Sequence, residues 1–279
     1  MDPSKQTETI ACESCAIHHS GNLIKLGVNM RNWDFVVVLA GNPNTGKSTV
    51  FNSLTGLRQH TGNWPGKTVV RAEGGFSYEN QKYKLVDLPG TYSLLSASQD
   101  EEVARDFILF GQPDVTVIVV DATRLERNLN LVLQVLEITD RAVICLNLMD
   151  EAKRHGLTVD DRRLARDLGV SVVPTAARQN EGIPLLLQSI QQVATGQVVC
   201  KPRRDRSEPA DLKRIIEKLT GQLSSIFPGL PNVRWVALRL LEGDKRIIEA
   251  IRSGELGDLN QGSVLSPLDG SSLTQEAVS

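Results

Sequence analysis

The sequence has few aromatic residues, few cysteines, almost no net charge and no long hydrophobic run. Aromatic residues make up 4% of its 279 residues, and 31 Lys plus Arg nearly balance 33 Asp plus Glu. A net charge of −2 gives no overall attraction to nucleic acid. The longest apolar stretches, DFVVVLA and VTVIVVDA, are far shorter than the roughly 20 residues of a membrane span. These absences favour a soluble globular protein without a nucleic-acid partner.

The four cysteines do not form the framework of a secreted disulfide protein. Cys145 lies inside an apolar run, where a buried reduced thiol is expected, and Cys200 stands alone. The first 20 residues contain no hydrophobic stretch of the kind that a secretory signal needs. The sequence therefore predicts a protein of the reducing cytosol.

The remaining two cysteines belong to an unusual stretch near the amino terminus, CESCAIHH. Cys12, Cys15, His18 and His19 have a spacing that could ligate Zn²⁺ or Fe²⁺. A tail without metal is the alternative, because nothing nearby in the sequence would pack around such ligands. Both interpretations stay open at this stage.

From residue 34 onward, apolar runs alternate with amphipathic patterns. Strands are expected at 34–40, 68–78, 81–87, 115–122, 141–150 and 170–175, and helices at about 98–110, 126–138, 158–168 and 183–194. The segments 68–78 and 81–87 are expected to form a hairpin. Strands that alternate with helices predict a doubly wound, mostly parallel α/β sheet.

The composition changes after Gly196. Residues 201–211, KPRRDRSEPAD, are charged and carry two prolines, as expected of a connector, and 210–226 and 243–252 have helical periodicity. The predicted domains are a tail at 1–33, a nucleotide-binding domain at 34–196, a small all-α helical domain at 197–254 and a flexible tail at 255–279.

A phosphate-binding loop is indicated at residues 41–49, GNPNTGKST. Gly41, Gly46, Lys47 and Ser48 satisfy the pattern G-x-x-x-x-G-K-[ST], between an apolar strand and a helix start. Glycines let backbone N–H groups converge on phosphates, and the helix N-terminus adds partial positive charge. Lys47 is expected on the β- and γ-phosphates and the Ser48 hydroxyl on Mg²⁺.

The choice of base is predicted from NLMD, residues 147–150. An Asp150 carboxylate can accept hydrogen bonds from N1–H and the exocyclic amine of guanine, whereas adenine would leave it unpaired. Asn147 is expected to brace the loop and the base edge. Backbone amides of TAAR, residues 175–178, are expected to back the guanine.

DLPG, residues 87–90, supplies a further element. Asp87 is expected to hold the Mg²⁺ shell through water, and the Gly90 amide to meet the γ-phosphate. Thr68 is the candidate for a second hydroxyl on Mg²⁺. Trp64, in the same expected first switch, is predicted to be covered, either in the core or in one nucleotide state. Together these elements predict binding of GTP.

The stretches GNPNTGKSTVFNSLTG, GNWPGKTV, DLPGTYSL, NLMD and RWVALRLLEGD resemble the cytosolic part of ferrous iron transport protein B, FeoB. The resemblance covers about 34–252. It implies a P-loop NTPase fold of the Ras-like G-domain type, a helical GDI-like domain that slows GDP release, and a polytopic membrane domain that this sequence lacks. The partners that the resemblance implies are that membrane domain, ferrous iron as the transported ion and further copies of the chain, at the cytoplasmic face of the bacterial inner membrane.

Two departures from Ras-like enzymes bear on hydrolysis. Thr91 follows DLPG, where a Gln would orient water, and it is too short for that role. The resemblance implies K⁺ activation instead, with Asn44 as the K⁺ ligand, although simple loop capping is the alternative for Asn44. Leu148 replaces the Lys of NKxD, and its apolar side chain can substitute for the Lys stem on the base.

The candidate site residues follow from these motifs. Nucleotide contacts are expected from Gly41, Asn42, Pro43, Asn44, Thr45, Gly46, Lys47, Ser48, Thr49, Asp87, Asn147, Leu148, Met149, Asp150, Thr175, Ala176 and Ala177. Catalytic roles are expected for Lys47, Asn44, Thr68 and Gly90, Mg²⁺ binding for Ser48, Thr68 and Asp87, and K⁺ binding for Asn44.

The predicted function is a GTP-hydrolysing regulatory domain of a ferrous iron transporter. One alternative is a free-standing GTPase that assists ribosome or tRNA maturation. Residues 201–218 speak against it, because seven Lys/Arg face four Asp/Glu and no aromatic residue is present for stacking on bases. A nucleotide-gated scaffold without useful hydrolysis is the other alternative, which the missing Gln keeps open.

Overall fold

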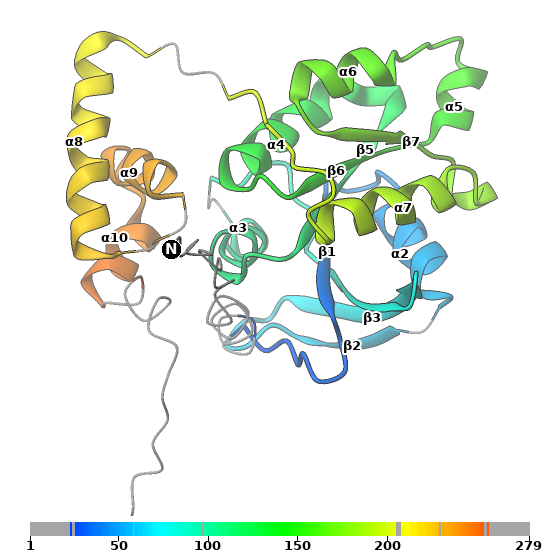
Figure 1. The fold of residues 1–279 in the computed structure, drawn as a ribbon, viewed down its shortest axis with the longest axis horizontal. Coiled ribbons are helices and arrows are strands. Elements are labelled where there is room, and N and C mark those ends of the chain that lie inside the picture. The colour runs from blue at the N-terminus through cyan, green and yellow to red at the C-terminus, as the bar shows by residue number, and fades with distance from the viewer. Residues whose placement is uncertain are drawn as a thin grey trace, which may run out of the picture.

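The computed structural model of the protein describes residues 23, 26–57, 59–95, 98–204, 208–228, 230, 232–253 and 256. Within these ranges a seven-stranded sheet with its helices forms one unit, and the helices after residue 209 stand beside it (Figure 1). The Cys12–His19 stretch and nearly all of the predicted carboxyl-terminal tail lie outside the described residues.

The sheet has the order β2-β3-β4-β1-β5-β6-β7. The strands are β1 (Phe35–Gly41), β2 (Gln59–Asn63), β3 (Val70–Tyr78), β4 (Gln81–Asp87), β5 (Val115–Asp121), β6 (Ala142–Asn147) and β7 (Ser171–Pro174). From β4 to β7 all neighbours are parallel, whereas β2 and β3 form an antiparallel edge. The predicted doubly wound, mostly parallel sheet is confirmed. Because these strands are parallel, the chain segments that follow them all begin at the carboxyl ends of the strands.

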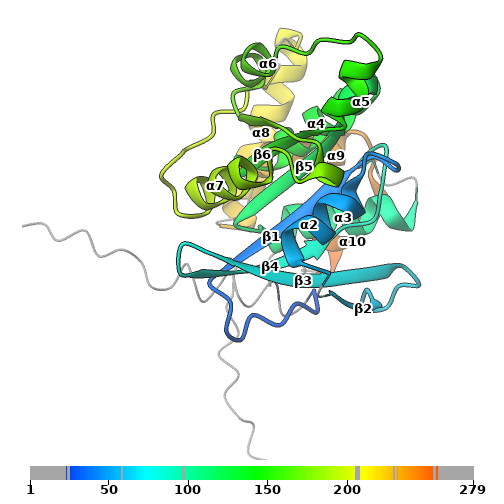
Figure 2. The same cartoon turned by 90° about the vertical axis from the view of Figure 1, so that its right-hand side faces the viewer.

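Helices cover both faces of the sheet, as Figures 1 and 2 show. They are α2 (Lys47–Thr55), α3 (Gln99–Gly111), α4 (Leu125–Ile138), α5 (Met149–Arg154), α6 (Asp161–Leu168) and α7 (Ile183–Ala194), with 3₁₀ turns η1 (Ala122–Arg124) and η2 (Ala177–Gln179). Helices α2 and α7 lie on one face, and α3 and α4 lie on the other. This layered arrangement is that of a P-loop G domain.

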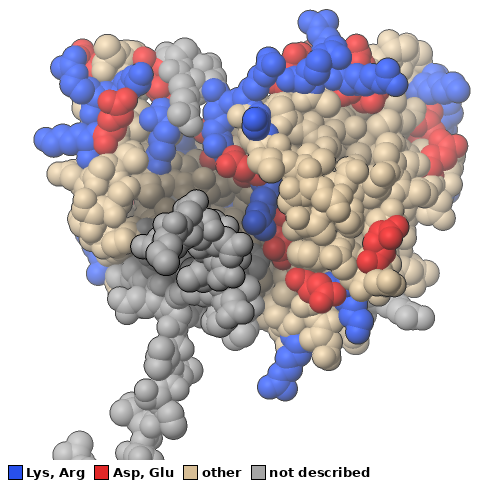
Figure 3. All heavy atoms as spheres, in the orientation of Figure 1, with Lys and Arg blue, Asp and Glu red and all other residues tan. Residues whose placement is uncertain are grey.

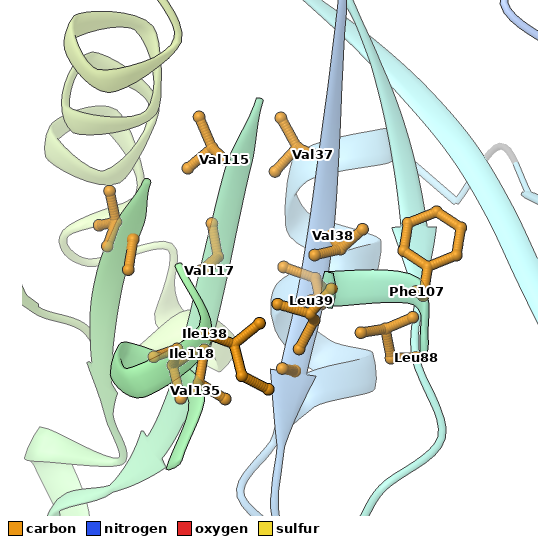
Figure 4. Close-up of a cluster of buried hydrophobic side chains, with 14 of the residues drawn as sticks. Val37, Val38, Leu39, Leu88, Phe107, Val115, Val117, Ile118, Val135 and Ile138 are labelled. Atoms are coloured by element: carbon orange, nitrogen blue, oxygen red, sulfur yellow. The ribbon is translucent and has the colours of Figure 1, made fainter. Parts of the chain in front are cut away.

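The core lies between β1, β5 and the helices that pack on them (Figure 4). Val38 and Leu39 of β1 and Val117 of β5 are fully buried, together with Phe107 of α3 and Val135 of α4. Because both faces of these strands are covered, their sequences are continuous apolar runs without alternation. This pattern made them the most predictable elements of the chain.

The β3–β4 hairpin is confirmed, and its turn explains its sequence. Tyr78 pairs with Gln81, so Glu79 and Asn80 form a two-residue turn in which both have positive φ, 48° and 60°. Such turns match the twist of antiparallel strands. Strand β2 was not predicted, because its sequence QHTGN is polar and has no alternation.

The predicted strand 141–150 ends early. It stops at Asn147, because Leu148 has a φ of 62° and α5 begins at Met149. A residue in the left-handed region ends an extended strand, and here it turns the chain at the carboxyl end of β6. The short helix α5 was not predicted.

The second unit contains α8 (Ala210–Ile226), α9 (Val233–Leu241) and α10 (Lys245–Arg252). Periodicity predicted α8 and α10 but not α9, whose apolar residues Trp235, Val236 and Ala237 are buried in succession rather than along one stripe. In the ranges that the structure describes, no helix combines the length and apolar character that crossing a membrane requires.

The segments flanking the sheet are more ordered than their composition suggested. Leu23 and Val28 are 0% and 1% exposed, so the expected irregular tail does not hold for residues 23 and 26–33. Cys200 is buried, and the Lys201 amide donates to the Gly169 carbonyl at 2.9 Å. The first residues of the expected connector therefore lie along the sheet domain.

A buried ion-pair cluster joins α3 to α10. Arg105 is 0% exposed and pairs with Asp106 at 2.9 Å and with Asp244 at 3.0 Å. Arg246 pairs with Asp106 at 3.2 Å and with Glu102 at 3.4 Å. Asp244 also caps α10, because its side chain accepts from the Arg246 and Ile247 amides. The cluster is a polar link between the two units.

Asp244→Ala tests this link. The substitution leaves the Arg105 guanidinium buried with one partner fewer and removes the α10 cap, so the free energy of unfolding should fall by about 3–5 kcal/mol. Urea denaturation followed by circular dichroism measures the change. The matched control is Asp211→Ala, because Asp211 pairs with Arg214 at 3.7 Å but its side chain is 92% exposed. Equal stability of the two variants would contradict the role of the cluster.

Candidate functional site

The phosphate loop lies between β1 and α2 and requires glycine at two positions. A Cβ at Gly46, which has a φ of 80°, would lie 2.4 Å from Asn147 Nδ2. A Cβ at Gly41 would lie 2.6 Å from the Val119 carbonyl oxygen. No side chain fits at such distances, so these glycines let the loop backbone pass close to β5 and to the end of β6.

The loop encloses a cavity of about 370 Å³. Its lining residues are Asn42, Pro43, Asn44, Gly46, Lys47, Ser48, Thr49 and Gly90. Ser48 and Thr49 are exposed in the first turn of α2, where backbone N–H groups point out of the helix. A Cβ at Gly90 would be 3.5 Å from Pro43, so the DLPG segment lies against the loop.

Lys47 spans from α2 to the end of β4. Its Nζ donates to the Leu88 carbonyl at 2.7 Å and is hydrogen-bonded to Asp87. Burial raises the pKa of Asp87 above its ordinary value, and the Lys47 ammonium opposes that rise. The lysine and the carboxylate expected to hold phosphate and Mg²⁺ therefore lie in direct contact.

Asn147, at the end of β6, joins two loops. It is 1% exposed. Its Nδ2 donates to the Thr45 carbonyl at 3.0 Å, in the phosphate loop. Its Oδ1 accepts from the Ala177 amide at 3.1 Å and from the Thr175 hydroxyl at 3.2 Å. The predicted bracing role of this side chain thus has a specific geometry: one amide holds the phosphate loop and the 175–178 loop together.

Asp150 lies in the first turn of α5, beside the 175–178 loop. Its Oδ2 accepts from Gln179 Nε2 at 3.2 Å and from Arg154 Nη2 at 3.4 Å, and its side chain remains 21% exposed. The Met149 amide donates to the Thr175 carbonyl at 3.2 Å. Sequence reasoning missed Gln179, since only the fold brings the η2 turn to this carboxylate.

The 175–178 loop is largely buried, at Thr175, Ala176 and Ala177. The Cys145 sulfur contacts the Thr175 hydroxyl at 3.2 Å, and burial raises the pKa of the Cys145 thiol to about 12. The thiol therefore stays protonated and supports the loop from the core.

Thr68 does not lie with the other predicted Mg²⁺ ligands. It is exposed, and its hydroxyl donates to Gln99 Oε1 of α3 at 3.2 Å. It does not line the cavity of the phosphate loop. Ser48 lines the cavity, and Asp87 is hydrogen-bonded to Lys47. Thr68 would have to move to join them.

Two further predictions concern Thr91 and Leu148. Thr91 is 4% exposed and its hydroxyl donates to the Ser93 carbonyl at 2.6 Å, so it faces the protein interior. It cannot orient water above the phosphate loop. The Leu148 Cδ2 lies 3.9 Å from where a Cβ at Gly46 would be, so this side chain packs against the loop.

The donor groups of the site suit a nucleotide phosphate chain with Mg²⁺. Asn42 Nδ2 is buried and has no hydrogen-bond acceptor, although it belongs to a residue lining the cavity. Lysine, helix amides and a hydroxyl are the usual phosphate donors, and hydroxyl and carboxylate oxygen are the ligands that Mg²⁺ prefers. Among the described residues, no group of three or more His, Cys, Asp or Glu could hold a metal.

A second cavity, of about 350 Å³, lies on the other side of the loop residues 42–45. Tyr92, Arg127, Glu151 and His155 are among its lining residues, and the Arg127 guanidinium lies 4.5 Å from the centre of the Tyr92 ring. Residues 42–45 of the phosphate loop and Leu148 of the NLMD motif also line it.

The model of the G-domain family "Ferrous iron transport protein B" matches residues 35–190, and the model of the "FeoB cytosolic helical domain" matches residues 209–266. The chain belongs to the FeoB family. A curated Fe(2+) transporter FeoB from Shigella flexneri is 39% identical over 216 residues. That alignment covers 74% of this chain and 26% of the relative, so the chain spans about a quarter of its length.

Solved FeoB structures agree with the fold. The cytosolic domain of L. pneumophila FeoB is 37% identical with a TM-score of 0.71, covering 81% of this chain and 89% of that one. The cytosolic domain of T. maritima FeoB in a GDP form is 36% identical with a TM-score of 0.71, covering 80% and 86%. Its GMPPNP form is 34% identical with a TM-score of 0.70, covering 83% and 88%.

Asn147→Ala tests the junction of the two loops without any ligand. The substitution leaves the Ala177 amide buried without its acceptor, so the free energy of unfolding should fall by about 1–3 kcal/mol. Thermal or urea denaturation provides the measurement. Asn130→Ala is the control, since Asn130 is exposed on α4 and accepts only a 3.4 Å bond from Gln134. A loss no greater than that of the control would refute the bracing role.

Proposed function

We propose that this chain binds GTP and GDP with Mg²⁺ and hydrolyses GTP as the regulatory part of a ferrous iron transporter. The main support is the Asn147 junction, which holds the phosphate loop and the base-facing loops in one fixed arrangement. The GDP and GMPPNP forms of the T. maritima relative support a guanine nucleotide in particular.

In this proposal Asp150 selects guanine. Its carboxylate is held by Gln179 and Arg154 and keeps a partly exposed edge, so it can accept the two donors of a guanine base. Leu148 packs beside the base in place of the Lys of other G domains. The 175–178 loop was expected to give backbone amides to the purine, but in the structure the Thr175 and Ala176 amides donate to the Leu146 and Glu181 carbonyls and the Ala177 amide donates to Asn147.

Hydrolysis would be in-line attack of water on the γ-phosphate. Lys47 would stabilise the charge that develops on the phosphate oxygens, and the amides of the 41–49 loop and of Gly90 would hold the group in place. Mg²⁺, held by Ser48 and Asp87, and by Thr68 once this residue moves, would supply charge neutralisation on the phosphates. No side chain near the cavity is assigned as the base, since Thr91 faces inward.

We further propose that K⁺ stimulates the reaction. Asn44 is exposed in the phosphate loop with a φ of 66°, and it lines the loop cavity. Its amide oxygen is thus available to a monovalent cation beside the phosphates. Such a cation would supply the positive charge that an arginine finger supplies in other G domains.

The iron-related part of the proposal concerns the longer protein. The curated relatives are Fe(2+) transporters, and the chain aligns with about a quarter of them. The chain would act at the cytoplasmic face of the membrane, with the membrane domain of the longer protein as its partner and ferrous iron as the transported ion. Self-association is compatible with this role.

Maturation of ribosomes or tRNA is not favoured as an alternative. Lys and Arg are intermixed with Asp and Glu on the face shown in Figure 3, and they do not gather into one basic surface there. The region after residue 209 matches a helical domain of the FeoB family rather than a nucleic-acid-binding appendage.

Asp150→Asn tests the choice of base. An amide cannot accept both guanine donors, so the preference for GTP over ATP should fall by about 10–100-fold. Competition of GTP and ATP with a fluorescent GDP analogue measures the preference. Glu151→Gln is the control, since Glu151 is the next residue of α5 and its side chain is 44% exposed. An unchanged preference in Asp150→Asn would contradict the assignment.

Asn44→Ala tests the monovalent cation. The rate of phosphate release in KCl should exceed that in NaCl for the unmodified chain, and this difference should disappear in the variant. Asn80→Ala is the control, because Asn80 has a similar φ of 60° but lies in the β3–β4 turn. Persistent K⁺ stimulation in Asn44→Ala would exclude Asn44 as the ligand.

A further inference from the structure

The amino-terminal segment, defined as residues 23 and 26–33, precedes the region matched by the G-domain family model. It is nevertheless packed onto the domain. Leu23 and Val28 are almost completely buried, and the Val28 amide donates to the Leu23 carbonyl at 2.8 Å. Burial of these two apolar side chains gives the segment a defined place.

One side of the segment covers the carboxyl end of α3. A Cβ at Gly111, the last residue of α3, would lie 3.0 Å from Leu26 Cδ1 and 3.5 Å from Leu23 Cδ2. Helix α3 also carries Gln99 and Glu102 at its other end. The segment therefore contacts the helix that binds the first-switch residues.

The other side contacts the 64–71 turn, the name used here for residues 64–71 of the expected first switch. Arg71 Nη1 donates to the Leu26 carbonyl at 3.2 Å. A Cβ at Gly27 would be 2.7 Å from Arg71 Nη1 and 2.9 Å from Pro65 Cγ, and Gly27 has a φ of 82°. Only glycine suits this close approach, so Gly27 fits the segment against both ends of the turn.

These contacts reach Trp64. The Arg71 guanidinium lies 5.2 Å from the centre of the Trp64 ring, and that ring meets Phe107 of α3 edge-on at 5.2 Å. Trp64 is 4% exposed, but its Nε1 has no acceptor. A buried donor without a partner weakens this packing. The turn therefore depends on support from the segment, which Arg71 of the turn contacts through the Leu26 carbonyl.

The same arrangement keeps Thr68 away from the phosphate loop. Thr68 donates to Gln99, and Lys67 pairs with Glu102 at 3.0 Å, so the turn is tied to α3 at two further points. For Thr68 to ligate Mg²⁺ beside Ser48, these contacts must break. The docked segment therefore favours the position in which Thr68 contacts Gln99, whereas Mg²⁺ ligation by Thr68 requires a different position of the turn.

We propose that the amino-terminal segment is an intramolecular regulator whose partner surface is the 64–71 turn together with α3. Docked, it holds Thr68 on Gln99 and disfavours the triphosphate-bound arrangement. Released, it frees the turn to close over the phosphates. The nucleotide part of this inference rests on the proposed function, whereas the contact between segment and turn does not.

Gly27→Val in the full chain tests the contact directly. Its side chain would collide with Pro65 and Arg71, so hydrogen–deuterium exchange of the amides in residues 64–71, measured without nucleotide, should rise about tenfold. Leu23→Asp, which places a charge at a buried position, should act in the same direction. Gly196→Val is the control, since Gly196 has a φ of 73° but an added Cβ meets nothing within 4 Å. Unchanged exchange in both variants would overturn the proposal.

The second arm measures Kd for GMPPNP and for GDP with Mg²⁺. If the docked segment leaves only about a tenth of the molecules competent for the triphosphate, release should improve GMPPNP binding about tenfold relative to GDP. Faster exchange with an unchanged ratio would show a contact without regulation and would overturn the inference. If the unmodified chain bound no guanine nucleotide, the proposed function would fail. The exchange arm would still decide whether the segment holds the turn.

Discussion

The buried side chain of Asn147 is the contact on which the geometry of the site depends. The phosphate loop and the 175–178 loop are far apart in the sequence, and the two functional groups of the Asn147 amide connect them at the end of β6. Because Gly46 leaves no room for a side chain next to Asn147, the loop and the amide constrain each other. The spacing between the phosphate loop and the 175–178 loop is therefore a property of the core rather than of flexible loops.

Helix α3 has the corresponding role on the other side of the molecule. It packs into the core through Phe107, receives Trp64 and Thr68 from the 64–71 turn, and presents Arg105 to α10. The amino-terminal segment covers its last residue, Gly111. One helix thus connects the 64–71 turn of the G domain with the helical unit.

The features that sequence could predict are those with strict local requirements. The phosphate loop needs glycine where the backbone approaches other strands, and β1 and β5 are apolar because both their faces are covered. The turn at Glu79 and Asn80 needs residues that accept positive φ. The position of Thr68 and the packing of Leu23 were beyond sequence reasoning, because they depend on contacts with distant α3 residues. Strand β2 was missed as well, since only pairing with β3 makes its polar residues extended.

Glu102 illustrates what a shared partner implies for communication. One carboxylate accepts Lys67 from the G domain and Arg246 from α10. If Lys67 or Arg246 moves away, Glu102 pairs with the remaining cation alone. Because both cations are partly shielded from water, their attraction to Glu102 is less screened than at an open surface. The strength of the Glu102–Arg246 ion pair at the boundary between the units therefore depends on the position of Lys67. This coupling needs no hinge and no large rotation.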